Sequence, residues 1–332
     1  MKTAMPEISR PAMVPGRAAD LLALLHQLEQ TQWWPAERIL EHQMEQLRLV
    51  LIHAHQNSTF YRQWLDKIGF DPAAPLNAAR WSRLPILTRD EVQDAGESLY
   101  CRSFPLTHGE AYETQTSEST GKVVKLRGTH LTNFFWQAIT LREHHWHRRD
   151  FKGALAVIRF NPELTQPEGT VFRDWGLPSN QIYITGPSMS LDTAADIRVQ
   201  AAWLERHQPQ YLLTYPSNLA ALINHFRQAG ADLKNLQEVR TIGETLTPAL
   251  RRACRESLGV PIIDLYSSQE MGYIALQCPE CAGYHVQAEN VLVEILDDAG
   301  NPCAPGEIGW MVVSGMHNFA VPLIRYELGD YA

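Results

Sequence analysis

One hydroxyl-rich stretch decides how this chain is interpreted: Thr116-Ser117-Glu118-Ser119-Thr120-Gly121-Lys122. Its first six positions hold four hydroxyl side chains and a glycine, and a lysine follows. Hydroxyl groups donate hydrogen bonds to phosphate oxygens, and a glycine lets successive amide N–H groups turn toward an anion. The stretch therefore predicts a phosphate-binding loop. It is not a P-loop, because the G-x-x-x-x-G-K-[ST] spacing is absent, and the residue types alone leave a solvated turn open as the alternative.

The bulk composition is that of an ordinary globular protein. The 332 residues are 45% apolar and 20% charged, with 29 basic and 37 acidic side chains and a net charge of −8. This balance argues against a general nucleic-acid or anionic-membrane surface. No apolar run approaches the roughly 18 residues of a membrane span. Five cysteines, an odd number, indicate a reducing compartment, and we expect a cytoplasmic protein.

The chain divides into four regions by pattern. We expect a disordered lead-in without a secretory signal at residues 1–17 and a helical region at 18–100. An α/β core is expected at 101–290, followed by a small β-rich lobe at 291–332. Strands that alternate with helices in the core predict an α/β fold with a largely parallel sheet. The predicted helices are 18–29, 36–55, 60–68, 89–96, 131–147, 193–207, 218–230 and 248–258. The predicted strands are 123–126, 153–160, 182–184, 210–214, 239–242, 261–266 and 291–295.

A group of histidines falls in the predicted helix 131–147. His144, His145 and His147 lie within one turn, which is a spacing that metal ligands use. Arginines at 142, 148 and 149 flank them, and neighbouring cations disfavour a bound metal ion. We therefore interpret this end of the helix as a basic, solvated face.

Further along the chain, three motifs follow the hydroxyl-rich stretch, and together they carry a family resemblance. The stretch resembles the T-S-G-S-T-G-x-P-x-K phosphate loop of the adenylate-forming (acyl-CoA synthetase-like) superfamily, with Lys125 as the trailing lysine. The G-G-E, Y-G-x-T-E and Y-x-T-G-D segments of that superfamily resemble 242–244, 266–270 and 326–330, in the same order. Two further segments are most similar to the phenylacetate-CoA ligase branch. These are the sequence at 322–326 and the dipeptide His285-Val286 before Val293-Glu294. The resemblance runs from about Leu47 to the last residue.

The resemblance implies a fold and a reaction. The fold is the large N-terminal domain of an adenylate-forming enzyme, with mixed and parallel sheets flanked by helices and a small β-rich lobe. In the reaction, a carboxylate attacks the α-phosphate of ATP to give an acyl-adenylate and pyrophosphate, and the thiol of coenzyme A then displaces AMP. Both reactants are anionic, so such an enzyme neutralises charge and aligns the groups. The family also implies a homodimer.

The resemblance assigns a role to each matching residue. In the nucleotide site, the β- and γ-phosphates would be bound by Ser117, Ser119, Thr120 and Gly121, and Lys125 would add positive charge nearby. Gly243 and Glu244 would form a wall of the adenine site, and Tyr266, followed by Ser267, would stack near the adenine. Asp330 would accept hydrogen bonds from the ribose hydroxyls. Gln269 would meet the α-phosphate and Glu270 would hold Mg²⁺, since a hard cation prefers oxygen ligands. Aromatic residues suit an aryl or arylacetic acid, and the candidates for that pocket are Phe135, Trp136, Tyr215 and Ile242.

The chain departs from the family pattern at several positions. Glu118 replaces a glycine of the phosphate loop, so a carboxylate would lie beside a triphosphate, which costs Coulomb energy. Val123 replaces the usual proline, and Ser267 and Gln269 replace Gly and Thr of Y-G-x-T-E. We expect Glu118 to weaken ATP binding or to alter how the loop moves, and Gln269 either to replace the threonine contact with the α-phosphate or to lose it.

The superfamily pattern continues past its G-D segment into a small domain that carries the adenylation lysine and rotates between the half-reactions. This sequence stops at Ala332, two residues after Asp330. We therefore expect a truncated form that binds nucleotide with little full turnover, or else a naturally short homologue. Two other functions stay open: a non-catalytic nucleotide- or partner-binding homologue, and an adenylating enzyme that passes the acyl group to another thiol or to an amine.

Cysteines suggest one further site. Cys278-Pro279-Glu280-Cys281 is a C-x-x-C motif, with His285 four residues later and Cys303 beyond it. Three thiolates and an imidazole are the ligands of a closed, tetrahedral zinc site. We expect a structural Zn²⁺ here, with free thiols in a loop as the alternative.

Overall fold

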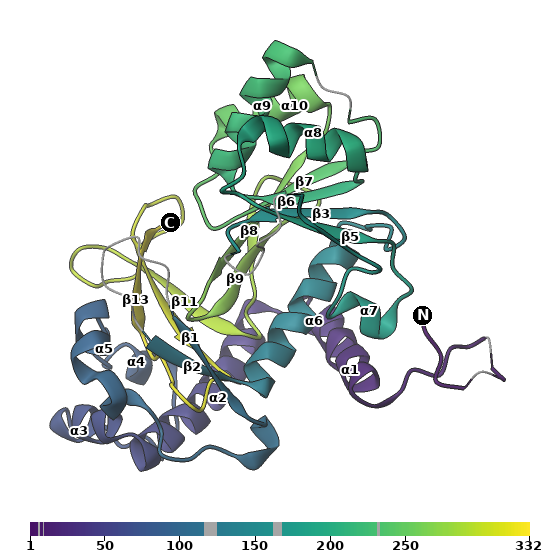
Figure 1. The fold of residues 1–332 in the computed structure, drawn as a ribbon. Helices are drawn as coiled ribbons and strands as arrows, with labels where there is room; N and C mark the ends of the chain where they lie inside the picture. Colours follow the sequence, from purple (N-terminus) through teal and green to yellow (C-terminus); the bar gives the residue numbers. More distant parts are fainter. Residues whose placement is uncertain (6, 9, 116–124, 162–167, 231–232) are drawn as a thin grey trace. The chain divides into compact units, whose positions relative to one another are not determined.

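A computed structural model of the chain describes all residues except 6, 9, 116–124, 162–167 and 231–232 (Figure 1). The described residues form two compact units, each assembled from separate stretches of the sequence. The first unit comprises Met1–Leu24, Thr140–Ser267 and Ala275–His285, and the second comprises Leu25–Ile139, Ser268–Ile274 and Val286–Ala332.

A large sheet forms the centre of the first unit. Its strands in chain order are β3 (Leu155–Arg159), β4 (Thr170–Phe172), β5 (Ser188–Asp192), β6 (Tyr211–Thr214), β7 (Glu238–Ile242), β8 (Ile262–Ser268), β9 (Gly272–Gln277) and β10 (Tyr284–Val286). Across the sheet they follow the order β10-β9-β8-β7-β6-β3-β5-β4 (Figure 1). The five strands from β8 to β5 pair in parallel, and β4 pairs antiparallel with β5. The predicted α/β fold with a largely parallel sheet is confirmed.

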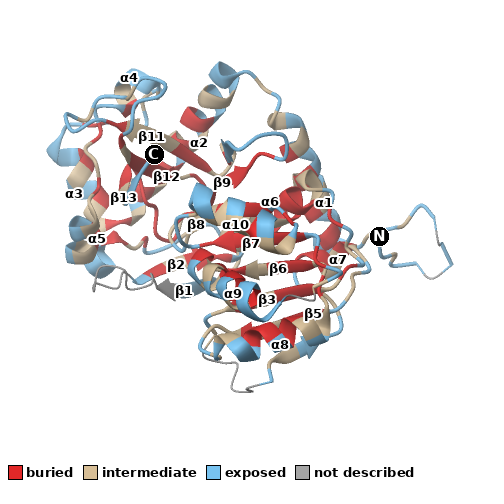
Figure 2. Cartoon of the chain, turned by 90° about the horizontal axis from the view of Figure 1, so that it is seen from above, coloured by how far each residue is buried: buried red, intermediate tan, exposed pale blue. Residues whose placement is uncertain are grey.

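Three helices cover one face of this sheet: α8 (Ile197–His207), α9 (Pro216–Ala229) and α10 (Pro248–Leu258) (Figure 1). Successive residues of a strand point to opposite faces, so Ala156 and Ile158 of β3 meet these helices. The core here is apolar, and Figure 2 shows it as the buried interior of the unit. Its other large members are Met189, Leu191, Trp203, Leu204, Leu212, Leu219, Leu222, Ile223, Phe226, Val239 and Ile262.

The opposite face of the sheet carries a smaller apolar cluster of Leu155, Trp175 and Tyr211. The strand predicted at 182–184 is wrong, because residues Ser179–Ile182 form a short helix, α7. The alternating apolar pattern misled the prediction: Ile182 is fully buried, whereas Ile184 is 66% exposed in the loop before β5.

Helices dominate the first part of the second unit, as the sequence predicted. Thr88 was expected as an N-cap and forms a full capping box with Glu91, whose side chain accepts from the Thr88 amide at 2.8 Å. Two longer helices, α1 (Gly16–Thr31) and α6 (His130–Trp146), contribute residues to both units. The remaining helical elements are α2 (Ala36–Asn57), α3 (Thr59–Lys67), α4 (Ala78–Trp81), α5 (Arg89–Ala95), η1 (Gly96–Leu99) and η2 (Leu106–His108).

Two antiparallel sheets complete the second unit. β1 (Ala111–Gln115) pairs antiparallel with β2 (Lys125–Thr129), and the residues of the expected phosphate loop lie between these strands in the sequence. β11 (Val291–Leu296), β12 (Trp310–Gly315) and β13 (Tyr326–Tyr331) form a three-stranded sheet in that order. A turn follows β11, where the Asp297 side chain accepts from two backbone amides. Within the described residues, no helix has the length and apolar character needed to cross a membrane.

Candidate active site

The predicted phosphate loop is flanked by described residues, but its own residues Ser117, Ser119, Thr120 and Gly121 lie outside them, as does Glu118. Lys125 opens β2 opposite Gln115, and its side chain is exposed. Its carbonyl oxygen accepts a hydrogen bond from the Tyr100 hydroxyl at 2.9 Å. The lysine is therefore fixed by its backbone while its ammonium group stays in solvent, where it is free to meet an anion.

In the first unit, the carboxyl ends of parallel strands gather several predicted residues. Tyr215 follows β6, Ile242 ends β7, and Tyr266 lies in the last part of β8. Thr214 pairs with Thr241, and Ile242 pairs with Leu265, so the three ends lie side by side. In open α/β sheets this edge is where ligands bind.

Gly243 turns the chain at this edge. Its φ of +80° lies in the left-handed region that glycine adopts without strain. A Cβ atom at this position would lie 3.4 Å from the ring of Tyr215, so the backbone passes close to that ring. The Arg159 guanidinium lies 5.9 Å from the centroid of the same ring. The edge therefore combines a close backbone approach, an aromatic face and a positive charge.

Glu244 is held by the next helix. Its carboxylate accepts hydrogen bonds from the Ser217 backbone N–H and from the Ser217 hydroxyl, each at 2.8 Å. Ser217 lies in the first turn of α9, where backbone N–H groups lack partners within the helix. The carboxylate therefore accepts from a backbone N–H that has no partner within the helix, and the positive end of the helix dipole stabilises its negative charge. Ser217 is not among the site residues that the sequence predicted, and it lies just before the predicted helix 218–230.

The second unit holds the other part of the Y-S-S-Q-E motif. Gln269 and Glu270 lie in the turn between β8 and β9, where the Ser268 hydroxyl accepts from the Met271 amide at 3.1 Å. Burial, together with the negative charge of Glu270, raises the pKa of Tyr326 to about 12. The Tyr326 hydroxyl is buried and has no hydrogen-bond partner within the described residues. The Glu270 carboxylate is of the chemical type that a hard cation prefers as a ligand.

Asp330 belongs to β13, close to the end of the described chain. β13 pairs with β12 through Tyr326 and Val313, and the register then shifts before Tyr331 meets Trp310. Gly329, with a φ of +91°, lies in this irregular part. Asp330 is exposed in this strand.

The four candidates for the acid pocket separate into two pairs. In the second unit, Phe135 stacks on His317 with ring centroids 3.7 Å apart, and Trp136 stacks on Tyr273 at 4.3 Å. Both rings are half-buried. The other pair, Tyr215 and Ile242, meets at the strand edge of the first unit described above. The stacking on His317 and Tyr273 fixes the orientation of the Phe135 and Trp136 rings.

The buried end of α6 corrects the predicted solvated basic face. Glu143 accepts from Arg149 at 2.6 Å and from Arg240 at 2.7 Å, and Arg149 also donates to Glu238 at 2.7 Å. The side chains of Glu143 and Arg149 are 0% and 1% exposed. Burial alone would raise the pKa of Glu143, but Arg149 and Arg240 outweigh it and hold that pKa well below its usual range. Burial, with Arg240, lowers the pKa of His144.

A second buried ion pair was also missed. The Arg325 guanidinium donates to both oxygens of Glu294, at 3.0 and 2.9 Å, and to the carbonyl oxygens of Ser82 and Leu84. Trp81 donates to the same carboxylate at 2.9 Å. This bidentate pair fastens the chain before β13 to β11 and to the segment after α4. Arg325 and Glu294 both lie in segments that carried the family resemblance, but nothing in the sequence indicated that they pair.

The predicted zinc site is not assembled. Within the described part of the chain, no group of three or more His, Cys, Asp or Glu side chains is placed to hold a metal ion. The ring of His285 packs edge-to-face against Trp146, with centroids 5.6 Å apart. Cys278 and Cys281 lie in the first unit, and Cys303 lies in the second. The Glu280 amide donates to the Cys278 sulfur and lowers the pKa of that thiol.

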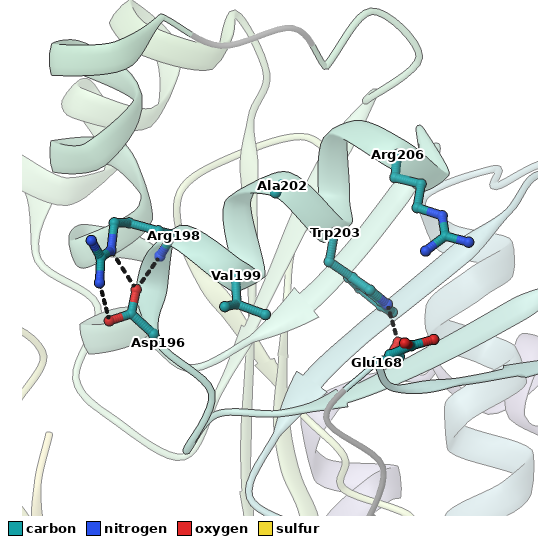
Figure 3. A pocket seen from close by; sticks show the side chains of 7 residues that line it. All are labelled: Glu168, Asp196, Arg198, Val199, Ala202, Trp203 and Arg206. Atoms are coloured by element: carbon teal, nitrogen blue, oxygen red, sulfur yellow. Dashed lines mark hydrogen bonds and ion pairs between the residues drawn. The ribbon is translucent and has the colours of Figure 1, made fainter.

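Two pockets contain none of the predicted site residues. The first, of about 560 Å³, lies along α8 (Figure 3). Asp196 and Arg198 form an ion pair at its side, and the Trp203 indole donates to the Glu168 carbonyl oxygen. The second, of about 430 Å³, lies beside α2 in the second unit. Its wall includes His317, whose ring stacks on Phe135.

Comparison with known proteins gives the class. Residues 183–321 match the model of the AMP-binding enzyme family. This segment carries the Gly243-Glu244 turn and the Y-S-S-Q-E motif. A solved 2-hydroxyisobutyryl-CoA ligase in an open conformation, in complex with 2-HIB-AMP and CoA, aligns with 90% of this chain and 70% of its own, with a TM-score of 0.71 and 16% identity. That likeness confirms the fold of the N-terminal domain of adenylate-forming enzymes.

The relatives agree with the resemblance to the phenylacetate-CoA ligase branch of the adenylate-forming superfamily that the motifs indicated. It is 24% identical to the phenylacetate-coenzyme A ligase of Thermus thermophilus over 310 residues, which is 89% of this chain and 66% of that protein. It is 25% identical to the enzyme of the same name from Escherichia coli over 296 residues, or 87% and 65% of the two. The chain thus spans just under two thirds of the length of these relatives.

Proposed function

We propose that this protein activates a carboxylic acid with ATP to an acyl-adenylate and transfers the acyl group to coenzyme A. The observation that carries the proposal is the strand edge of the first unit. There Tyr215, Gly243 and Tyr266 lie together, inside the segment that matches the AMP-binding enzyme family. An aromatic face beside a close backbone turn suits a flat adenine ring, and the carboxyl edge of a parallel sheet is a common place for a nucleotide.

The roles proposed for individual residues are those that the family resemblance implies. Tyr266 would stack on the base beside the Gly243 turn, and Asp330 would accept hydrogen bonds from the ribose hydroxyls. Ser117, Ser119, Thr120, Gly121 and Lys125 would hold the β- and γ-phosphates. Gln269 would contact the α-phosphate in place of the threonine of related motifs.

A magnesium ion is proposed at the turn between β8 and β9, where Glu270 would supply an oxygen ligand. The charge of Glu270 also acts on Tyr326, whose hydroxyl lacks a partner within the described residues. A bound Mg²⁺ would supply positive charge that draws electron density from the phosphate oxygens. Glu270 would orient that charge, and the residues of the phosphate loop would align the α-phosphate with the attacking carboxylate.

The class of acid is proposed from the aromatic candidates. Phe135 and Trp136 offer half-buried rings in the second unit, and Tyr215 offers another in the first. Such rings suit an aryl or arylacetic acid. Coenzyme A is proposed as the acceptor because the relatives are named for it, and the five cysteines, none of them disulfide-bonded, agree with a cytoplasmic setting.

ATP–pyrophosphate exchange tests this function most economically. We expect exchange that depends on an added carboxylic acid, is stronger with arylacetic than with short aliphatic acids, and falls at least tenfold in Glu270→Gln. Exchange that is absent with every acid, although ATP binds, would favour the non-catalytic nucleotide-binding alternative. Exchange that is present without any thioester of coenzyme A would favour another thiol or an amine as acceptor.

Glu118 allows a separate test of the same site. The variant Glu118→Gly removes a carboxylate from the predicted phosphate loop, so we expect it to tighten Mg-ATP binding severalfold. The control is Glu113→Gly on the neighbouring strand, whose carboxylate pairs with Arg127 at 3.4 Å. Equal affinities in the parent and in Glu118→Gly would contradict the placement of the triphosphate in this loop.

A further inference from the structure

A pocket of about 420 Å³ in the first unit joins a pair of thiols to positive charge. It is lined by one side of α10, the start of β8 and the loop that follows β9. Cys278 and Cys281 come from the loop, and Arg252 and Arg255 come from the helix. None of these residues is used by the proposed adenylation chemistry.

The loop holds the two sulfur atoms in different settings. Cys278 is buried, and its sulfur accepts a hydrogen bond from the Glu280 amide at 3.4 Å. Cys281 is exposed, and its sulfur accepts from the Gly283 amide at 3.4 Å. The Cys278 amide donates to the Gly283 carbonyl at 2.8 Å, which closes the loop on itself. Amide donors stabilise thiolates, and the C-x-x-C spacing lets the two sulfurs form a disulfide.

The charge of the pocket comes from α10. Arg251 is already engaged, because it donates to the Ile262 carbonyl and to the Gln277 side chain at 2.8 Å each. Arg252 and Arg255 are exposed, and neither forms an ion pair in the part of the chain that the structure describes. Glu280 supplies one negative charge on the opposite side. The arginines therefore make the approach to Cys281 attractive for an anion.

We propose that Cys278 and Cys281 form a thiol–disulfide exchange site for small disulfides that carry negative charge. The exposed Cys281 thiolate attacks such a disulfide, RSSR, to give a mixed disulfide and one RS⁻. The Cys278 thiolate then attacks the Cys281 sulfur, which forms the Cys278–Cys281 disulfide and releases the second RS⁻. The two cysteines lose two electrons and the small disulfide gains them. Arg252 and Arg255 bind the anionic groups of RSSR before the first step.

Single cysteine variants separate the two steps. Oxidised glutathione serves as the anionic probe, and intact-protein mass spectrometry is the readout. The parent is expected to lose two hydrogen atoms, and Cys278→Ser is expected to retain one glutathione moiety on Cys281. Cys281→Ser is expected to react at least tenfold more slowly. The matched control is Cys303→Ser, which removes a half-buried thiol of the second unit and is expected to behave like the parent.

The charge requirement has its own test, which leaves both cysteines in place. Cystamine is a small disulfide with positive charge, and coenzyme A disulfide is a second anionic probe. Arg252→Gln with Arg255→Gln is expected to slow exchange with both anionic disulfides about fivefold and to leave cystamine unchanged or faster. The control Arg206→Gln, on α8, is expected to change neither rate.

Three results would overturn the proposal. In the first, Cys278→Ser traps no mixed disulfide on Cys281. In the second, anionic and cationic disulfides react alike with the parent and with the double arginine variant. In the third, the purified chain holds one equivalent of zinc on these thiols and resists exchange until the metal is removed.

Discussion

Glu244 accepts two hydrogen bonds from Ser217, so that the turn after β7 caps the first turn of α9. The contact joins two neighbouring strand ends, because α9 follows β6 directly. It fixes the Gly243 turn against the ring of Tyr215. A residue that the family resemblance assigns to the adenine wall therefore also organises the edge on which that wall is built.

The variant Glu244→Gln tests this capping role. It keeps one acceptor oxygen and loses the charge and the second acceptor, so we expect a loss of about 1 kcal/mol in the free energy of unfolding. Urea denaturation measures it. Glu37→Gln is the control, since Glu37 lies exposed in the first turn of α2 with no hydrogen bond there, and it should cost no more than a few tenths of that amount. Equal losses in both variants would show that the two hydrogen bonds add nothing.

Glu143 should be far more important for stability than a surface glutamate. Glu143→Gln removes the carboxylate that neutralises Arg149 and Arg240, both of them buried, and we expect a loss of about 3 to 5 kcal/mol. Glu256→Gln is the matched control, because Glu256 pairs with Arg227 at 3.5 Å on the surface and should cost less than about 1 kcal/mol. Chemical denaturation of both variants measures the loss in the free energy of unfolding of each. A loss below 1 kcal/mol for Glu143→Gln would mean that the cluster does not hold α6 to the sheet.

Arg325 should not tolerate lysine. Arg325→Lys cannot keep the two-point contact with Glu294 and the bonds to two carbonyl groups, so we expect a loss of about 2 to 3 kcal/mol. The comparison is Arg198→Lys, which alters an exposed pair with Asp196 and should be nearly neutral. The measurement is the shift of the thermal unfolding midpoint of each variant. Similar shifts would contradict the role assigned to the buried pair.

His317 should make the protein less stable in acid. Burial lowers the pKa of His317 to about 4, from an ordinary value near 6.5, although the Glu289 carbonyl opposes the shift. Between these values the unfolded chain binds a proton that the folded chain does not, so stability is present above about pH 6.5 and falls as the pH drops toward 4. Because the side chain is partly exposed, we expect about 1 to 2 kcal/mol. His317→Gln should flatten this part of the stability–pH curve relative to the parent. His42→Gln, which alters another histidine of the same pocket, should leave it unchanged.

The sequence predicted most of the elements because their signals are local. Thr88 and Glu91 form a capping box that depends on residues three apart, and α10 begins and ends where a proline and a glycine indicated. The strand prediction failed at 182–184, where residues with an alternating apolar pattern form the end of a short helix and a loop.

Contacts between distant residues were not predictable in the same way. Arg149 and Glu238 are 89 positions apart, and nothing in either neighbourhood indicates the partner. A row of arginines and histidines at the end of α6 therefore suggested a solvated face, although buried carboxylates neutralise it. The zinc prediction failed for a related reason: Cys278, Cys281 and His285 have suitable spacing, but the imidazole packs on Trp146.

Calorimetric titration of Mg-ATP tests the central claim most directly. We predict that the parent chain binds nucleotide, that Asp330→Ala weakens binding at least tenfold, and that Asp298→Ala, an exposed acid in the turn after β11, changes nothing. That result would place the ribose at β13. A parent chain that binds no Mg-ATP, or that binds it with the same affinity in all three proteins, would contradict the account.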